Sequence, residues 1–254
     1  MSIRAKFKKE IVSKSDIPNI DGYVKSNSDN LIEGITSDLF EKDLQQGSGS
    51  ELESKFNALY SSSALVVNSF ALIKKILADF SFKGLSNFTG AQFERKFPTN
   101  LGGTPPNLDF ALENSNSLIA FESKYLELLA KKEVKFSESY KKANLAYLND
   151  FWFDLIDFYK GSKNYLDVAQ LIKHSIGLIN YRAKSNKILV YIYWHPDNHV
   201  DFEEYTIHAK EIEEFAERLK EQQDIEFCSI TYSEFWDYCK QYNDLKNMVD
   251  NIEK

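Results

Sequence analysis

The chain has 254 residues, of which 43% are hydrophobic and 14% aromatic, and it carries a formal net charge of −7. This composition supports a packed core and excludes a long disordered chain, and two cysteines are too few for a disulfide framework. No apolar run approaches the ~18 residues of a membrane-spanning helix, and the N-terminus lacks the apolar stretch of a signal peptide, so we expect a cytoplasmic protein with no membrane partner.

The first residues are polar and mixed in charge, and they give little sign of regular structure. We interpret the whole chain, 1–254, as one domain in three parts. These are an N-terminal extension (1–47), a core (48–200) and an acidic C-terminal part (201–254). The glycine- and serine-containing stretch QQGSGS at 45–50 marks the boundary between the first two parts.

A helical segment is predicted after this boundary. Ser50 is a suitable N-cap, and Glu51 and Glu53 lie in the first turn, where the helix dipole favours carboxylates. Apolar residues then recur near helical spacing to about Ala78.

Three segments of strand character come next, at 91–97, 108–112 and 117–125. The glycines and prolines of LGGTPPN at 101–107 disfavour regular structure between the first and the second. The polar residues at 113–116 predict a hairpin turn between the second and the third.

The second half of the chain alternates helices with strands. Helical patterns are predicted at 137–159, 165–180, 202–222 and 233–248, and strands at 187–194 and 225–231. The strand KILVYIYW is apolar throughout, which is typical of a central strand buried on both faces. The order α-β-β-β-α-β, followed by helix, strand and helix, predicts an α/β fold with a mixed central sheet flanked by helices.

The charge is unevenly distributed. Residues 201–254 hold 15 acidic and 6 basic side chains, a net charge of −9, which leaves +2 for residues 1–200. Within the latter, residues 121–200 hold 12 basic and 9 acidic side chains. The first 200 residues can therefore present a surface to nucleic acid although the whole chain is acidic, but solvated charges explain the pattern equally well.

Three residues of the predicted hairpin form a candidate catalytic set. Glu122 and Lys124 are two residues apart on one strand, so they share a face of the sheet. With Ser115 and Asn116 at the centre of the turn, Asp109 lies opposite Glu122, and opposed residues have Cβ atoms about 4.5–5.5 Å apart.

Two carboxylates at that distance repel each other unless a cation neutralises them. Oxygen ligands suit Mg²⁺, for which Mn²⁺ commonly substitutes, and the lysine can orient a water molecule and stabilise charge on a phosphate. We therefore expect Asp109 and Glu122 to bind metal and Lys124 to act beside them. The alternative is a sheet with scattered polar residues on its solvent side.

The arrangement resembles the PD-(D/E)XK nuclease superfamily, in which an Asp on the second strand and (D/E)-x-K on the third form the active site. Asp109 and Glu122-Ser123-Lys124 match this pattern, although Pro105 and Pro106 lie upstream instead of a proline directly before the aspartate. Further segments are similar to a restriction-endonuclease-like bacterial family, over about residues 48–240. They are FNALYSSSALVVNSFA (56–71), GGTPPNLDF (102–110), IAFESK (119–124), FSESY (136–140), AQLIKH (169–174) and YIYWHP (191–196).

The resemblance implies that a further acidic residue from the first helix joins the catalytic metal site. We assign this role to Glu51, with Glu53 as the alternative and Glu94 of the first strand as a third candidate. Both helix residues are equally well explained as favourable charges at a helix N-terminus.

Two more groups of residues are candidates for contact with DNA. On the predicted helix 165–180, Gln170, Lys173 and His174 fall on one side, so Gln170 joins the catalytic candidates and Lys173 the DNA-contacting ones. A solvated helix face is the alternative and the one we favour for His174. Gly103 and Thr104 let the loop approach a phosphate, although a structural turn explains them equally well.

The sequence thus predicts a Mg²⁺-dependent nuclease that hydrolyses DNA, and the resemblance implies a restriction or defence role. Two alternatives stay open: a nucleic-acid-binding protein that keeps the fold without catalysis, and an enzyme that cuts RNA or nicks one strand. The intact Asp-Glu-Lys set argues against loss of catalysis. Cutting of both strands would suit a homodimer, which the sequence leaves open.

Overall fold

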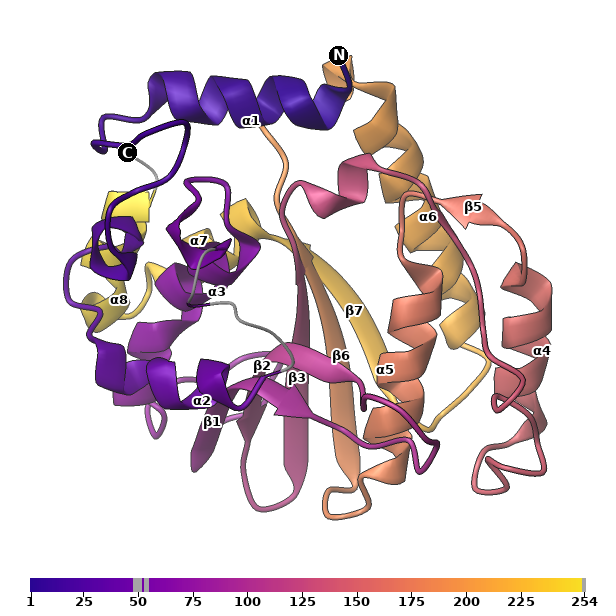
Figure 1. Cartoon of the computed structure of the whole chain (residues 1–254). Helices are drawn as coiled ribbons and strands as arrows, with labels where there is room; N and C mark the ends of the chain where they lie inside the picture. Colours follow the sequence, from indigo (N-terminus) through magenta and orange to yellow (C-terminus); the bar gives the residue numbers. More distant parts are fainter. Residues whose placement is uncertain (48–51, 53–54, 253–254) are drawn as a thin grey trace.

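The computed structural model describes residues 1–47, 52 and 55–252. At its centre is a five-stranded sheet with helices on both faces (Figure 1). In the order β1-β2-β3-β6-β7, the first three strands are antiparallel neighbours, and β6 and β7 run parallel to β3. The strands are β1 (Gly90–Lys96), β2 (Asn107–Glu113), β3 (Ser117–Lys124), β6 (Asn186–Tyr193) and β7 (Glu226–Thr231). The α/β fold with a mixed central sheet is confirmed.

Helices cover the two faces of the sheet in two groups. One face carries α3 (Ser62–Phe70), α7 (Tyr232–Cys239) and α8 (Asn243–Ile252), and the other carries α4 (Asp150–Tyr159), α5 (Val168–Asn180) and α6 (Glu203–Leu219) (Figure 1). The predicted C-terminal helix-strand-helix is confirmed as α6, β7 and α7. Short 3-10 helices join these elements, namely η3 (Lys55–Asn57), η4 (Ala71–Lys75), η5 (Glu127–Leu129) and η6 (His199–Asp201).

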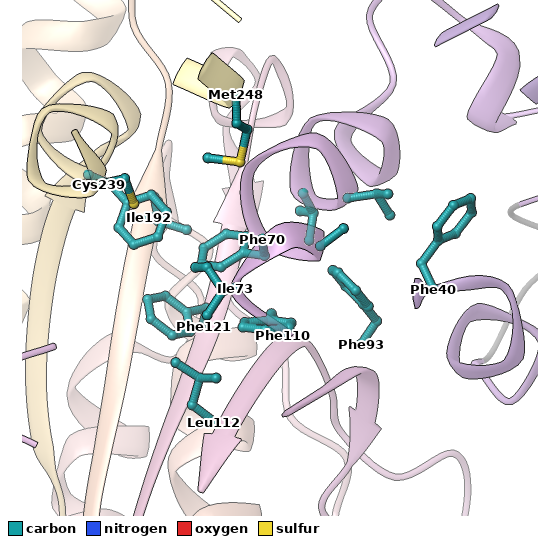
Figure 2. Close-up of a cluster of buried hydrophobic side chains, with 14 of the residues drawn as sticks. Phe40, Phe70, Ile73, Phe93, Phe110, Leu112, Phe121, Ile192, Cys239 and Met248 are labelled. Atoms are coloured by element: carbon teal, nitrogen blue, oxygen red, sulfur yellow. The ribbon is translucent and has the colours of Figure 1, made fainter. Parts of the chain in front are cut away.

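An aromatic core fills the space between the sheet and α3. Figure 2 shows Phe70 of α3 beside Phe110 and Phe121, and the centre of its ring lies 4.8 Å and 4.9 Å from theirs. The ring of Phe235 on α7 is also close, at 4.7 Å from that of Phe70. We call these four residues the aromatic cluster. Burial of such rings, each worth 150–250 Å² of surface, fixes α3 and α7 on this face.

The N-terminal segment carries more structure than the sequence predicted. It forms α1 (Ile3–Lys14), η1 (Asn27–Asn30), η2 (Ser37–Leu39) and α2 (Glu41–Gln45). In α1, Phe7 is the buried residue, and its ring meets those of Trp194, Phe202 and Tyr205. Phe40 stacks on Phe56 at 5.5 Å. The expectation of little regular structure in the first residues was wrong. Single apolar residues such as Phe7 and Phe40 attach this segment to the rest of the protein, and its mostly polar sequence lacks the hydrophobic periodicity that would predict a helix.

Two predicted helices differ from the structure. Only Asp150–Tyr159 of the segment 137–159 is helical, because the serines and asparagines before it form turns in which Asn144 donates to the Ser139 carbonyl. The last predicted helix is two helices, α7 and α8. A small two-stranded sheet of β4 (Lys132–Glu133) and β5 (Lys163–Asn164), which the sequence did not indicate, flanks α4. Within the described part of the chain, no helix is both long and apolar enough to span a bilayer.

Candidate active site

The hairpin of β2 and β3 has the register that the sequence predicted. Phe110 pairs with Phe121 and Glu113 with Leu118, so the next position brings Asp109 to the level of Glu122. The Asp109 carboxylate accepts a hydrogen bond from the backbone N–H of Ser123 at 2.6 Å through Oδ2. This bond fastens the first candidate carboxylate directly to the strand that carries the second.

Glu122 and Lys124 lie on the face of the sheet that is turned toward α5. Their side chains are nearly inaccessible, with 2% of Glu122 and 8% of Lys124 exposed as whole residues. The Lys124 ammonium donates to Oε1 of Glu122. We call Asp109, Glu122 and Lys124 the charged cluster. It occupies the same two strands as Phe110 and Phe121 of the aromatic cluster but the opposite face, because side chains alternate along a strand.

The three groups of the charged cluster respond differently to their surroundings. Burial raises the pKa of Glu122, but the charges of Lys124 and His174 outweigh it and hold that pKa at about 2. Burial lowers the pKa of Lys124, but the two carboxylates reverse this and raise it. For Asp109, burial and then the Glu122 charge raise the pKa well above its ordinary value. The site thus favours one carboxylate–ammonium pair and disfavours a second negative charge unless a cation accompanies it.

Glu94 of β1 is the acidic residue that the structure places next to Asp109. Its neighbours Phe93 and Arg95 pair with β2 on either side of Asp109, and its charge raises the pKa of Asp109. Its carboxylate accepts a hydrogen bond from Asn107. The backbone of Glu94 is left-handed, with φ of 51°, an uncommon and costly conformation for a residue with a side chain. Strain of this kind concentrates at functional sites.

His174 of α5 reaches the same cluster, which the sequence did not predict. Only 2% of it is exposed, and its Nε2 lies 2.8 Å from Oε2 of Glu122. The solvated-face interpretation of His174 was therefore wrong. The burial of His174 is explained by Gly177, which lies three residues later on α5. A Cβ on Gly177 would come within 2.4 Å of the carbonyl oxygen of Phe97. The backbone of α5 therefore packs directly against the backbone at Phe97, and this contact buries the helix face that carries His174.

The other candidates on α5 do not meet the charged cluster in the same way. Gln170 is half-buried, and its backbone N–H donates to the carboxylate of Asp167, the N-cap of α5. The Lys173 ammonium lies over the rings of Phe136 and Tyr140, at 5.5 and 5.8 Å from their centres. Lys173 thus stands beside an aromatic pair at the neighbouring position to His174.

The remaining candidates belong to loops. Gly103 and Thr104 are exposed, and Gly103 has φ of 98°, a value that a residue with a side chain rarely adopts, so the turn itself accounts for this glycine. Glu51 and Glu53 lie outside the described residues. Neither assignment to the metal site is therefore tested.

The carboxylate and imidazole groups of the site are suitable ligands for a divalent cation, although the described residues do not form a complete set of metal ligands. As they stand, no three His, Cys, Asp or Glu side chains among the described residues are arranged to hold a metal ion. However, Oε2 of Glu122 and Nε2 of His174 are buried and meet only each other, in an ion pair that is not well aligned as a hydrogen bond within the described part of the chain. Buried polar atoms are nearly always satisfied, so these two are suited to receive a ligand.

Comparison with known proteins identifies the relationship of this chain. A family model described as "Restriction Endonuclease associating with ARP" matches residues 6–252, which include the N-terminal segment, the sheet and the C-terminal helices. No curated protein and no solved structure matched. Because the family model spans nearly the whole sequence, the chain belongs to this restriction-endonuclease-like family.

Proposed function

We propose that the protein is a metal-dependent nuclease of the PD-(D/E)XK type that hydrolyses phosphodiester bonds of DNA. The observation that carries the proposal is the placement of Asp109 at the level of Glu122 and Lys124 on the β2–β3 hairpin, where Glu122 and Lys124 are buried and paired and both influence the pKa of Asp109. A structural ion pair would not need the second carboxylate, which raises the electrostatic cost of the site. Membership of a restriction-endonuclease-like family supports DNA as the substrate.

Asp109 and Glu122 are the residues that would hold a Mg²⁺ or Mn²⁺ ion, with Glu94 adjacent and Glu51 as the sequence-based candidate. Such an ion supplies positive charge to the phosphate and lowers the pKa of water. Lys124 is held by Glu122, so its ammonium has a fixed place beside the metal ligands. From there it can orient the attacking water and stabilise negative charge that develops on the phosphate.

The biological role that we propose is restriction or defence, and the family description supports it. The same description speaks of association with ARP, so we propose a partner of that designation for this chain as well. A homodimer would suit cutting of both strands and is tested by comparing the mass in solution with and without DNA.

The test of the proposed function is cleavage of plasmid, linear DNA and RNA with Mg²⁺, Mn²⁺ or EDTA. We expect DNA cutting that needs the cation and that Asp109→Ala, Glu122→Ala and Lys124→Ala each abolish. Lys246→Ala, an exposed change on α8, is the matched control and should cut normally. Thermal melts establish that the variants are folded.

The outcomes separate the alternatives. Undiminished cutting by all three alanine variants would refute the assignment of the site. DNA binding without cutting under any cation would favour a nucleic-acid-binding protein, and preferential cutting of RNA or relaxation of plasmid to the nicked form would identify the other two activities.

A further inference from the structure

The contact between α5 and the sheet at Glu122 has unusual geometry. Nε2 of His174 and Oε2 of Glu122 are 2.8 Å apart, the distance of an ion pair, although the two atoms are not well aligned as a hydrogen bond among the described residues. Both are buried. Buried polar atoms are nearly always well hydrogen-bonded, so this poorly aligned pair is one that a bound ligand could complete.

The separation of these atoms suits two ligands of one metal ion as well as it suits an ion pair. Donor atoms that sit about 2.0–2.1 Å from an ion, at right angles to each other, are about 2.9 Å apart. The other oxygen of Glu122, Oε1, is already taken by Lys124, so Oε2 is the oxygen that remains for a cation. The imidazole Nε2 of His174 lies 2.8 Å from this oxygen.

We infer that His174 is a direct ligand of the metal ion that Asp109 and Glu122 would hold. This inference rests on the proposed function, and it adds a nitrogen donor from α5 to a site that the sequence assigned to carboxylates alone. The close approach of Gly177 to Phe97 holds α5 against the β1–β2 connection, so the ring is carried by a helix of fixed position. A preplaced ligand is what a metal site needs.

A nitrogen ligand changes which cations the site prefers. Imidazole suits transition metals, whereas Mg²⁺ prefers oxygen alone. The protein should therefore bind Co²⁺ more tightly than Mg²⁺ by a margin that depends on His174. His174→Gln removes the ring nitrogen but keeps a polar group, so it should reduce the ratio of Co²⁺ to Mg²⁺ affinity by about tenfold or more, as even outer partners of metal ligands are worth about 10–100-fold.

The direct test is pulsed EPR of the full-length protein with Mn²⁺, together with calorimetric titration of Co²⁺ and Mg²⁺. The wild type should show coupling of the electron spin to an imidazole nitrogen. His174→Gln should lose it. The matched control is His208→Gln, which removes another fully buried histidine, one whose Nε2 is bonded to the Tyr191 hydroxyl, and it should keep the coupling.

The outcomes of these measurements test the role of His174 separately from the proposed function. A wild-type Mn²⁺ complex without nitrogen coupling would overturn the inference and leave His174 as a charge partner of Glu122 alone, and this measurement stands even if His174→Gln fails to fold. Metal binding that Asp109→Ala abolishes but His174→Gln leaves unchanged would also overturn it, while the proposed nuclease would survive. If the wild type binds no divalent cation, the proposed function itself fails.

Discussion

Strands β2 and β3 present Phe110 and Phe121 of the aromatic cluster toward α3 and the charged cluster toward α5, and these two clusters contribute to folding in opposite ways. The rings of Phe70, Phe110 and Phe121 exchange water contact for packing, which stabilises the protein. On the other face, Glu122 and Lys124 give up hydration for one ion pair, and Asp109 adds a like charge. The α5 face also packs Ala111, Leu118 and Ala120 into a hydrophobic core, so the cost to stability is confined to the end of the hairpin that carries the charged cluster.

The largest effect is expected at the aromatic cluster. Phe70→Ala removes a fully buried ring and should lower the free energy of unfolding by about 3–5 kcal/mol. Urea unfolding in EDTA measures the change. Phe158→Ala, at an exposed phenylalanine of α4, is the control and should cost less than about 1 kcal/mol. Equal losses at the two positions would contradict the stabilising role of the aromatic cluster.

A pH effect is expected at His208, on the α5–α6 side of the sheet. Burial, and secondarily His195, lowers the pKa of His208 to about 3 in the folded protein, from an ordinary 6.5. The unfolded chain therefore binds a proton first, so stability is lost as the pH falls below 6.5. Between pH 7 and pH 5 this group should cost about 2 kcal/mol.

The measurement is the free energy of unfolding of the wild type and of His208→Gln across that range. The variant should lose less stability on acidification by that amount, since glutamine can still meet the Tyr191 hydroxyl without taking up a proton. Parallel curves would show that His208 is protonated equally in both states.

The charged cluster should respond to substitution with the opposite sign to the aromatic cluster. Asp109→Asn removes one of two close carboxylates yet keeps an oxygen for the Ser123 N–H, so in EDTA it should raise the free energy of unfolding by about 0.5–2 kcal/mol. Mg²⁺ should stabilise only the wild type and so reduce or reverse the difference. Paired thermal melts test this. A variant less stable in EDTA, with equal Mg²⁺ shifts, would remove the argument for a metal site.

The smallest effect is expected at Lys173, at the border of the charged face. Lys173→Ala should weaken DNA binding by less than about 1 kcal/mol, and by more than Lys246→Ala, because Lys173 lies on α5 next to His174 whereas Lys246 is exposed on α8. Binding of labelled DNA at two salt concentrations distinguishes the two. Equal losses would return Lys173 to a structural role over Phe136 and Tyr140.

Short-range sequence patterns predicted the β2–β3 hairpin and its register. They did not predict the burial of His174, which depends on packing between residues far apart in the sequence. A polar turn at Ser115 and Asn116 between two apolar runs fixes which residues oppose one another, and this was enough to place Asp109 near Glu122. The burial of His174 depends on how closely α5 approaches the β1–β2 connection, 77 residues earlier at Phe97, and no periodicity within the helix reports that distance. A glycine three residues from a histidine was the available signal.

The left-handed backbone of Glu94 also bears on how the protein behaves at high concentration. β1 is an edge strand, and an open edge is a template on which another chain can add a strand. Here the outward N–H of Phe93 is occupied by the carboxylate of Asp43, and the next residue turns the peptide groups out of line. Strand-by-strand growth is therefore blocked at β1, so a second copy of the chain has to associate through another surface.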